Sequence, residues 1–189
     1  MDDSTQIFGK LDSEQVIIDD SETILELELK GFGEKENGIL ILRSFETLYL
    51  LYTKKLCLKK SKKEIDFDSF MNICQNEDPE ILTKFLIYRD LRTRGYVVKD
   101  GFGFGSDFRV YERGHYGDKG AKFLIFGLNE GQSEKINSLQ KKIHQITQMG
   151  KEPIIGVIER RGEVIYYKIN KMNFFDNTSK FDGFSTSNL

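Results

Sequence analysis

Long hydrophobic runs are absent from this chain of 189 residues. No stretch of about 18 apolar residues occurs, so we do not expect a membrane-spanning helix. The opening residues MDDSTQIFGK are acidic, unlike the basic start of a secretory signal peptide. We therefore expect a soluble, globular protein of the cytoplasm, with 39% hydrophobic and 31% charged residues.

Cysteine is scarce as well. The chain has two, Cys57 and Cys74, and neither belongs to a CxxC or Cys/His pattern of the kind that binds zinc. We therefore expect two buried thiols, and no metal or other cofactor.

The chain also lacks an excess of basic residues. Lys and Arg number 28 against 30 Asp and Glu, which gives a formal net charge of −2. Proteins that bind nucleic acid regardless of its sequence usually carry a large positive charge. Any contact with RNA or DNA is therefore expected to be local.

Phosphate-binding loops are missing too. No G-x-G-x-x-G or G-x-x-x-x-G-K-[ST] motif precedes an expected helix. The glycine-rich run GFGFGS at 101–106 joins two expected strands, and no helix N-terminus follows it to hold an anion. We expect a hairpin there and not a nucleotide site.

Residues 1–78 predict a small mixed N-terminal domain. Alternating or β-branched runs at 15–19, 23–31 and 38–43 predict three strands of an antiparallel sheet, and LCLK at 56–59 predicts a further short strand.

Two helices are expected to pack on that sheet, at 44–55 with Ser44 as N-cap and at 66–76. Their expected inner faces comprise Leu48, Leu51 and Tyr52 in the first helix and Phe67, Phe70, Met71 and Cys74 in the second.

Residues 79–176 predict a C-terminal α/β domain, so the whole chain is expected to be of a mixed α/β class. Asp78 and Pro79 begin a helix that Gly95 ends, and three strands, a helix and two strands follow. The strands are GYVVKDG, DFRVYERG, KFLIFGL, PIIGVIE and EVIYYKI, and the helix SEKINSLQKKIHQITQM has Ile136, Leu139, Ile143 and Ile146 on its expected inner face. The polar tail at 177–189 is expected to be disordered.

Two segments of the second domain resemble a known family. The runs YRDLRTRGYVVKDGFGFGSDFRVYERG at 88–114 and GKEPIIGVIERRGEVIYY at 150–167 are similar to the signature and the closing strand pair of the archaeal tRNA-splicing endonucleases, or tRNA-intron lyases. The hydrophobic order of the first half is similar to that family's N-terminal domain. The resemblance implies a restriction-nuclease-like C-terminal domain with a central mixed sheet, and assembly as a homo- or hetero-oligomer of two or four copies of the fold.

The resemblance also implies an activity. Members of the family cleave precursor tRNA at a bulge-helix-bulge without metal, and leave a 2′,3′-cyclic phosphate and a 5′-hydroxyl. A tyrosine, a histidine and a lysine perform this reaction. The tyrosine falls on Tyr111 and the lysine on Lys151, whereas the place expected for the histidine falls on or beside Gly120, in the run GDKGAK, which has no histidine.

Attack of a ribose 2′-hydroxyl on its own phosphate needs a base, a cation and an acid. Tyr111 would be the base if cations such as Arg113 and Lys151 lowered its pKa, and Lys151 would stabilise the charge on the phosphate. His115, four residues after Tyr111, either replaces the missing acid or is a solvent-exposed loop histidine.

The family pattern assigns roles to four further residues. We expect Arg109 and Arg113 to contact the substrate, and Glu130 and Tyr166 to lie in the subunit interface. One arginine that should help to hold a flipped base is replaced by Gly150, and only Glu130 is charged in the expected acidic loop GLNEG.

Three hypotheses follow. The chain is a catalytic subunit that uses Tyr111 and Lys151, or a structural subunit that positions an active homologue on precursor tRNA, or a DNA-binding or DNA-cleaving module on the same fold. The missing histidine favours the structural subunit. Asp107 and Glu112 would suit a metal-dependent nuclease, but no ExK-like cluster follows on the next strand.

Overall fold

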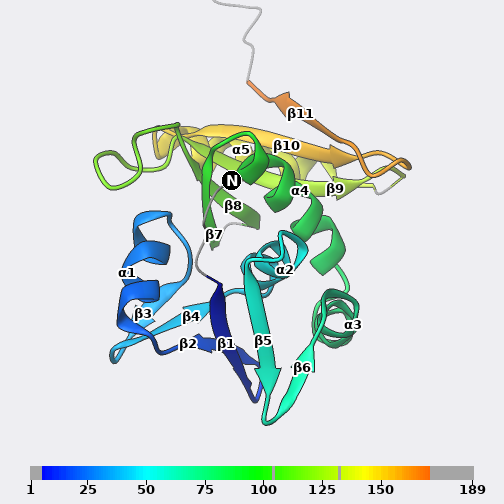
Figure 1. Cartoon of the computed structure of the whole chain (residues 1–189). Helices are drawn as coiled ribbons and strands as arrows, with labels where there is room; N and C mark the ends of the chain where they lie inside the picture. The colour runs from blue at the N-terminus through cyan, green and yellow to red at the C-terminus, as the bar shows by residue number, and fades with distance from the viewer. Residues whose placement is uncertain (1–5, 104, 132, 171–189) are drawn as a thin grey trace, which may run out of the picture.

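A computed structural model describes residues 6–103, 105–131 and 133–170. Within these ranges the chain forms five helices and two mixed sheets, one sheet in each half of the chain (Figure 1). This confirms the expected mixed α/β class. No helix in the described ranges is long and apolar enough to cross a membrane. The expected disorder at 177–189 falls outside the described residues.

The N-terminal sheet is built from short strands. They are β1 Ile7–Asp12, β2 Gln15–Ile18, β3 Glu34–Glu36, β4 Ile39–Leu42, β5 Leu56–Lys60 and β6 Lys63–Ile65. Their order is β3-β4-β2-β1-β5-β6, in which β1 and β5 are parallel and the other neighbours are antiparallel. Strands β2, β4 and β5 confirm three of the four strands expected in this half.

The fourth expected strand is wrong. The run TILELELKG belongs to helix α1 (Ser21–Leu29), which begins where the Asp20 carboxylate accepts a hydrogen bond from the Thr23 backbone N at 2.9 Å. Ile24 and Leu27 are its buried residues, three positions apart as on one helical face. Leu and Glu both favour helices, so the cap and the propensity of these residues outweigh their strand-like alternation.

Helix α2 (Ser44–Tyr52) lies where it is expected, but its cap differs. Arg43, and not Ser44, is the N-cap residue, and the Glu46 side chain accepts a hydrogen bond from the Arg43 backbone N at 2.9 Å.

The buried face of α2 also differs from the expected one. Leu48 is buried, but Leu51 is only half-buried and Tyr52 is exposed. Phe45 and Leu50 are buried in addition, because α2 packs against the sheet on one side and against helix α4 on another.

Helix α3 (Phe67–Glu77) buries Phe70, Met71 and Cys74 as expected, and Phe67 is partly buried. Burial raises the pKa of the Cys74 thiol to about 11, so this cysteine is a neutral core residue. Cys57 is only half-buried, so the expectation of two buried thiols holds for Cys74 alone.

The C-terminal sheet has the order β11-β10-β9-β8-β7. Its strands are β7 Val97–Gly103, β8 Ser106–Tyr111, β9 Phe123–Asn129, β10 Glu152–Ile158 and β11 Val164–Lys168, with helices α4 Ile81–Thr93 and α5 Ile136–Gln148. All five strands are at their expected positions, and β7 and β8 pair antiparallel as the expected hairpin, with Gly103 opposite Ser106. The parallel pair β9 and β10 is joined through α5.

Helix α4 and its preceding turn connect the two halves. The Asp78 carboxylate accepts a hydrogen bond from the Glu80 backbone N at 2.9 Å, and Gly95 follows the end of the helix with a φ of +84°. The predicted domain boundary after Asp78 falls in the short connection between α3 and α4.

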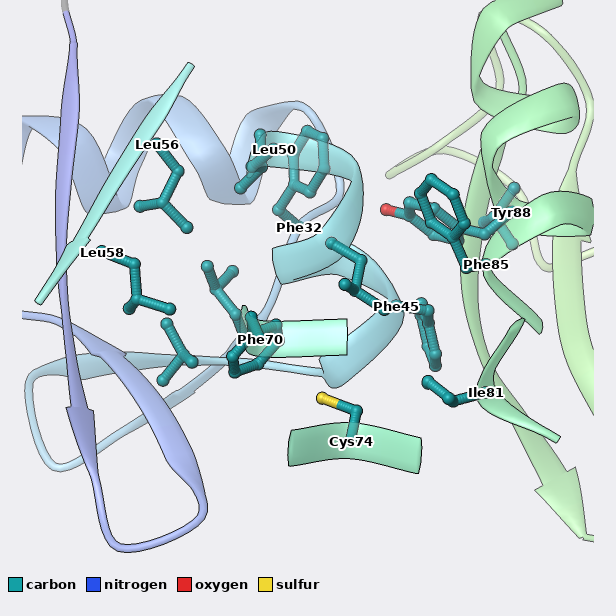
Figure 2. Close-up of a cluster of buried hydrophobic side chains, with 14 of the residues drawn as sticks. Phe32, Phe45, Leu50, Leu56, Leu58, Phe70, Cys74, Ile81, Phe85 and Tyr88 are labelled. Atoms are coloured by element: carbon teal, nitrogen blue, oxygen red, sulfur yellow. The ribbon is translucent and has the colours of Figure 1, made fainter. Parts of the chain in front are cut away.

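The two halves share one hydrophobic core (Figure 2). Phe45 on α2 packs against Tyr88 on α4, with ring centroids 5.0 Å apart, and against Phe108 on β8 at 5.1 Å. These rings join the N-terminal half to the second sheet, so the position of each half depends on the other.

Helix α5 does not have the inner face expected from its sequence. Ile146 is buried, but Leu139 and Ile143 are half-buried and Ile136 is 80% exposed. Only part of the apolar stripe reaches the sheet, where α5 packs on β9 and β10. The small core beneath it contains Leu124, Phe126 and Ile155.

Phe108→Ala tests the shared core. The ring is fully buried, so its loss should lower the free energy of unfolding by about 3–5 kcal/mol, as measured by urea titration. Phe8→Ala is the control, because Phe8 is 64% exposed and its loss should change that energy by no more than about 0.5 kcal/mol. If both variants lowered the free energy of unfolding equally, Phe108 would not join the two halves of the chain.

Candidate active site

The residues expected to act in catalysis lie at one edge of the second sheet. Tyr111 ends β8, Gly120 precedes β9, and Lys151 precedes β10. The backbone connects the three strand ends, since Lys122 N donates to the carbonyl of Val110 and Glu152 N donates to the carbonyl of Lys122, both at 2.9 Å. The fold therefore brings residues from three separate segments to neighbouring positions.

Lys151 occupies the space beside Gly120. A Cβ atom built on Gly120 would lie 3.3 Å from the Lys151 Nζ. The residue expected to be histidine is therefore adjacent to the expected lysine, and the glycine leaves room for the ammonium group.

The side chain of Tyr111 contacts another tyrosine. Its ring meets that of Tyr116 edge to face, with centroids 5.0 Å apart and an interplanar angle of 89°. Burial is the main reason why the pKa of Tyr116 is raised above its usual value, so its phenol is neutral at physiological pH. Tyr116 is thus an aromatic support for Tyr111.

Tyr116 in turn rests against the N-terminal half. A Cβ atom on Gly31 would lie 3.3 Å from the Tyr116 ring and 2.3 Å from the Val97 Cγ1. The backbone of the turn after α1 therefore approaches the site closely. The sequence analysis did not single out Tyr116 or Gly31, and no sequence motif would have done so.

The two arginines expected to contact substrate differ in their exposure. Arg109 is half-buried and precedes Tyr111 by two residues, so both project from the same face of β8. Arg113 is exposed, and its guanidinium lies over the Tyr96 ring at 4.8 Å from the centroid.

His115 belongs to a charged cluster on the loop after β8. Its Nδ1 lies 3.5 Å from the Glu112 Oε2 and its Nε2 lies 3.5 Å from the Lys119 Nζ. Glu112 also forms an ion pair with Lys122, whose hydrogen bond lowers the pKa of the carboxylate. Among the described residues, no hydrogen bond or ion pair connects His115 with Tyr111.

The two residues expected in the subunit interface make contacts inside the chain. Tyr166 donates a hydrogen bond from its hydroxyl to the Asp90 Oδ2 at 2.8 Å, so its side chain faces α4. The Glu130 Oε2 accepts a hydrogen bond from the backbone N of Arg160 at 3.0 Å, in the turn between β10 and β11.

No group of three or more His, Cys, Asp or Glu side chains able to hold a metal ion occurs in the part of the chain that the structure describes. Asp107 accepts a hydrogen bond from the Gly127 backbone N at 2.6 Å, and burial is the main reason why its pKa is raised. Asp107 therefore helps to hold β8 against β9 within the sheet.

The fold and this edge of the sheet define a two-part α/β protein whose second sheet has a tyrosine at the end of β8 and a lysine just before β10, on either side of β9. Residues 81–166 match the family described as tRNA intron endonuclease, catalytic C-terminal domain, and residues 7–71 match tRNA intron endonuclease, N-terminal domain.

Relatives of similar length are found in archaea. A tRNA-splicing endonuclease of Methanococcus maripaludis is 33% identical over 162 residues, which cover 85% of this chain and 92% of that protein. One from Thermococcus onnurineus is 34% identical over 143 residues, or 76% of this chain and 82% of that protein. The chain belongs to the tRNA intron endonuclease family.

Gly31→Ala tests how closely the N-terminal half approaches the site, with Gly38→Ala as its control. Both glycines have a positive φ, +75° and +85°, so alanine strains the backbone at either position. Only at Gly31 would the new Cβ also meet a neighbour, since no described atom lies within 4 Å at Gly38. In denaturant titrations we expect Gly31→Ala to lower the free energy of unfolding by about 1–3 kcal/mol more than Gly38→Ala. Equal losses would contradict the close approach.

Proposed function

We propose that this chain is a subunit of a tRNA-splicing endonuclease, and that it is the structural subunit of a hetero-oligomer whose homologous subunit performs the cleavage. One observation carries this proposal: Gly120 stands where the family's histidine is expected, directly beside Lys151. The family membership supports precursor tRNA as the substrate of the complex, in preference to DNA.

The proposed reaction shows why the histidine matters. A base removes the proton of a ribose 2′-hydroxyl, which attacks the adjacent phosphate, and the bond from phosphorus to the 5′-oxygen breaks. An acid must protonate that 5′-oxygen as it leaves, and a cation must stabilise the charge on the phosphate. Loss of the acid typically costs about 10²- to 10⁴-fold in rate. Neither the base nor the cation replaces it.

The surroundings of His115 do not support a substitute acid at this position. Its ring nitrogens face Glu112 and Lys119, within a cluster on the loop after β8. Among the described residues, no hydrogen bond or ion pair connects His115 with Lys151.

A second candidate is a catalytic subunit with a replaced acid. It is favoured by the retention of both Tyr111 and Lys151 at the same edge of the second sheet, on strands that flank β9. In that case both residues would act on the substrate without metal, Tyr111 as base and Lys151 as charge stabiliser.

Association with a homologous subunit is supported by β11. Among the described residues, this strand pairs with β10 alone and is the last strand in the order of the second sheet. Ile165 is 37% exposed and Tyr167 is 53% exposed. An open edge with exposed apolar side chains suits pairing with a second strand. We therefore assign the interface to Ile165 and Tyr167, since Tyr166 faces α4.

Ile165→Asp should weaken this association, because it places a charge at the proposed interface. We expect the apparent dissociation constant of the complex to rise by at least about tenfold, as measured by analytical ultracentrifugation. Leu29→Asp is the matched control, since Leu29 is an 82% exposed leucine on α1 and its change should leave assembly unaltered. Equal assembly of both variants would remove β11 from the interface.

Single-turnover cleavage of an intron-containing precursor tRNA in EDTA separates the two candidate roles. The chain is assembled with a homologous subunit of the same organism that has the tyrosine, histidine and lysine set. We expect Tyr111→Phe, Lys151→Ala and His115→Ala in this chain to change the rate by no more than about twofold. Loss of the tyrosine in the partner should lower the rate by at least about tenfold.

A large rate loss from Tyr111→Phe, with assembly and RNA affinity unchanged, would identify this chain as the catalytic subunit.

A further experiment measures cleavage by the Gly120→His variant of this chain without its partner, with Gly120→Ala as control. Only the histidine variant should gain cleavage, because alanine adds a Cβ atom but no proton donor. A strict requirement for magnesium, with RNA that is folded beforehand, would argue against the metal-free reaction.

A further inference from the structure

The hairpin of β5 and β6 concentrates positive charge in a chain whose formal net charge is −2. Residues 54–63, which read KKLCLKKSKK, contain six lysines and no acidic residue. All six lysines are exposed, and within the described ranges none of them forms a salt bridge. The hairpin is therefore a local basic surface on a chain that has no overall basic excess.

Two of these lysines lie directly opposite each other. Ser61 and Lys62 form the turn of the hairpin, and Lys60 pairs with Lys63 across it. Residues that face each other in an antiparallel pair have Cβ atoms about 4.5–5.5 Å apart, and like charges in such a pair are destabilising. An anion bound at this end of the hairpin would relieve the repulsion.

The neighbouring carboxylates do not cancel this charge. Glu64 lies opposite Lys59, and the alternation of side chains along a strand places these two on the other face of the hairpin from Lys60 and Lys63. Asp66 attracts Lys63, but its carboxylate caps α3, where it accepts a hydrogen bond from the Ser69 backbone N at 2.9 Å. The end of the hairpin thus keeps an excess of positive charge.

The turn of this hairpin points away from the second sheet (Figure 1). Tyr111 and Lys151 lie at an edge of that second sheet. The lysines of the hairpin are therefore separate from the candidate active site, and any contact that they make with a substrate lies outside the cleaved bond.

We propose that Lys59, Lys60, Lys62 and Lys63, which we call the basic tip, bind phosphates of the RNA substrate outside its cleavage sites. The choice of RNA rests on the proposed function. A lysine ammonium is a compact charge with three donors, and it binds a phosphate without reading the base. The basic tip therefore adds affinity and orientation for folded RNA, and no sequence preference.

An acidic protein fits the basic tip less well than RNA does. Protein interfaces usually have an apolar or aromatic centre that excludes water. The exposed residues at 59–64 are four lysines, a serine and a glutamate, so they offer charge without such a centre. A row of phosphates needs only the charge.

Binding of a precursor tRNA that cannot be cleaved tests the basic tip. The RNA has 2′-deoxyriboses at both cleavage sites, so it lacks the attacking hydroxyl groups, and its affinity for the assembled complex is measured by fluorescence anisotropy in EDTA. For Lys60→Gln with Lys63→Gln we expect Kd to rise by at least about tenfold at about 100 mM salt. The slope of log Kd against log salt concentration should decrease by about 2. The midpoint of urea unfolding should not fall, because the change removes the repulsion between these lysines.

Lys30→Gln with Lys35→Gln is the matched control. It removes the same amount of charge from the N-terminal half, but Lys30 forms a salt bridge with Glu26, and Lys35 forms one with Glu28. Since these charges are already compensated, we expect Kd for the RNA to change by no more than about twofold.

Equal RNA affinities of the Lys60 and Lys63 variant and the control would overturn the basic tip and leave the proposed function standing, because cleavage tests that function separately. A wild-type complex that did not bind precursor tRNA would contradict both. Polyglutamate is the probe for an acidic protein partner. If it bound as tightly as the RNA and lost this affinity in the Lys60 and Lys63 variant, the assignment of the basic tip to RNA would be wrong.

Discussion

The turn at residues 30–33 is held by a buried pair of opposite charges, and the two halves of the chain meet at this turn. Both Glu46 carboxylate oxygens accept from the Gly33 backbone N at 3.1 Å, and Lys99 donates to the Gly33 carbonyl. Burial raises the pKa of the Glu46 carboxyl and lowers that of the Lys99 ammonium, while each group favours the charged form of the other. Arg92 donates to the first carbonyl of the turn at 2.9 Å. Removal of either buried charge would leave the other without its partner.

The same turn supports the candidate site. Gly31 lies against Tyr116, and Tyr116 lies against Tyr111, so the turn that Glu46 and Lys99 hold is connected to the tyrosine of the second half. This scaffold is complete although Gly120 offers no proton donor. In a structural subunit, the scaffold would preserve the shape of the domain and its contact with a partner after the reaction itself had moved to that partner.

Local patterns predicted most of the fold, because caps, glycine stops and residue periodicity act over a few neighbouring residues. They failed where one pattern fits two structures, as in TILELELKG, which alternates like a strand but follows the helix-capping Asp20. They also failed where burial depends on a distant neighbour. The stripe on α5 is apolar throughout, yet Ile136 stays exposed because no described residue covers it.

The sequence by itself determined which side chains are available at the candidate site. Tyr111 and Lys151 are present, and position 120 has no histidine. It also determined the family, since the similar residues span both halves of the chain. Only the tertiary structure decided that His115 joins Glu112 and that Tyr166 turns towards α4. Side-chain direction depends on partners that the folded backbone brings close, and a single sequence does not record which partners those are.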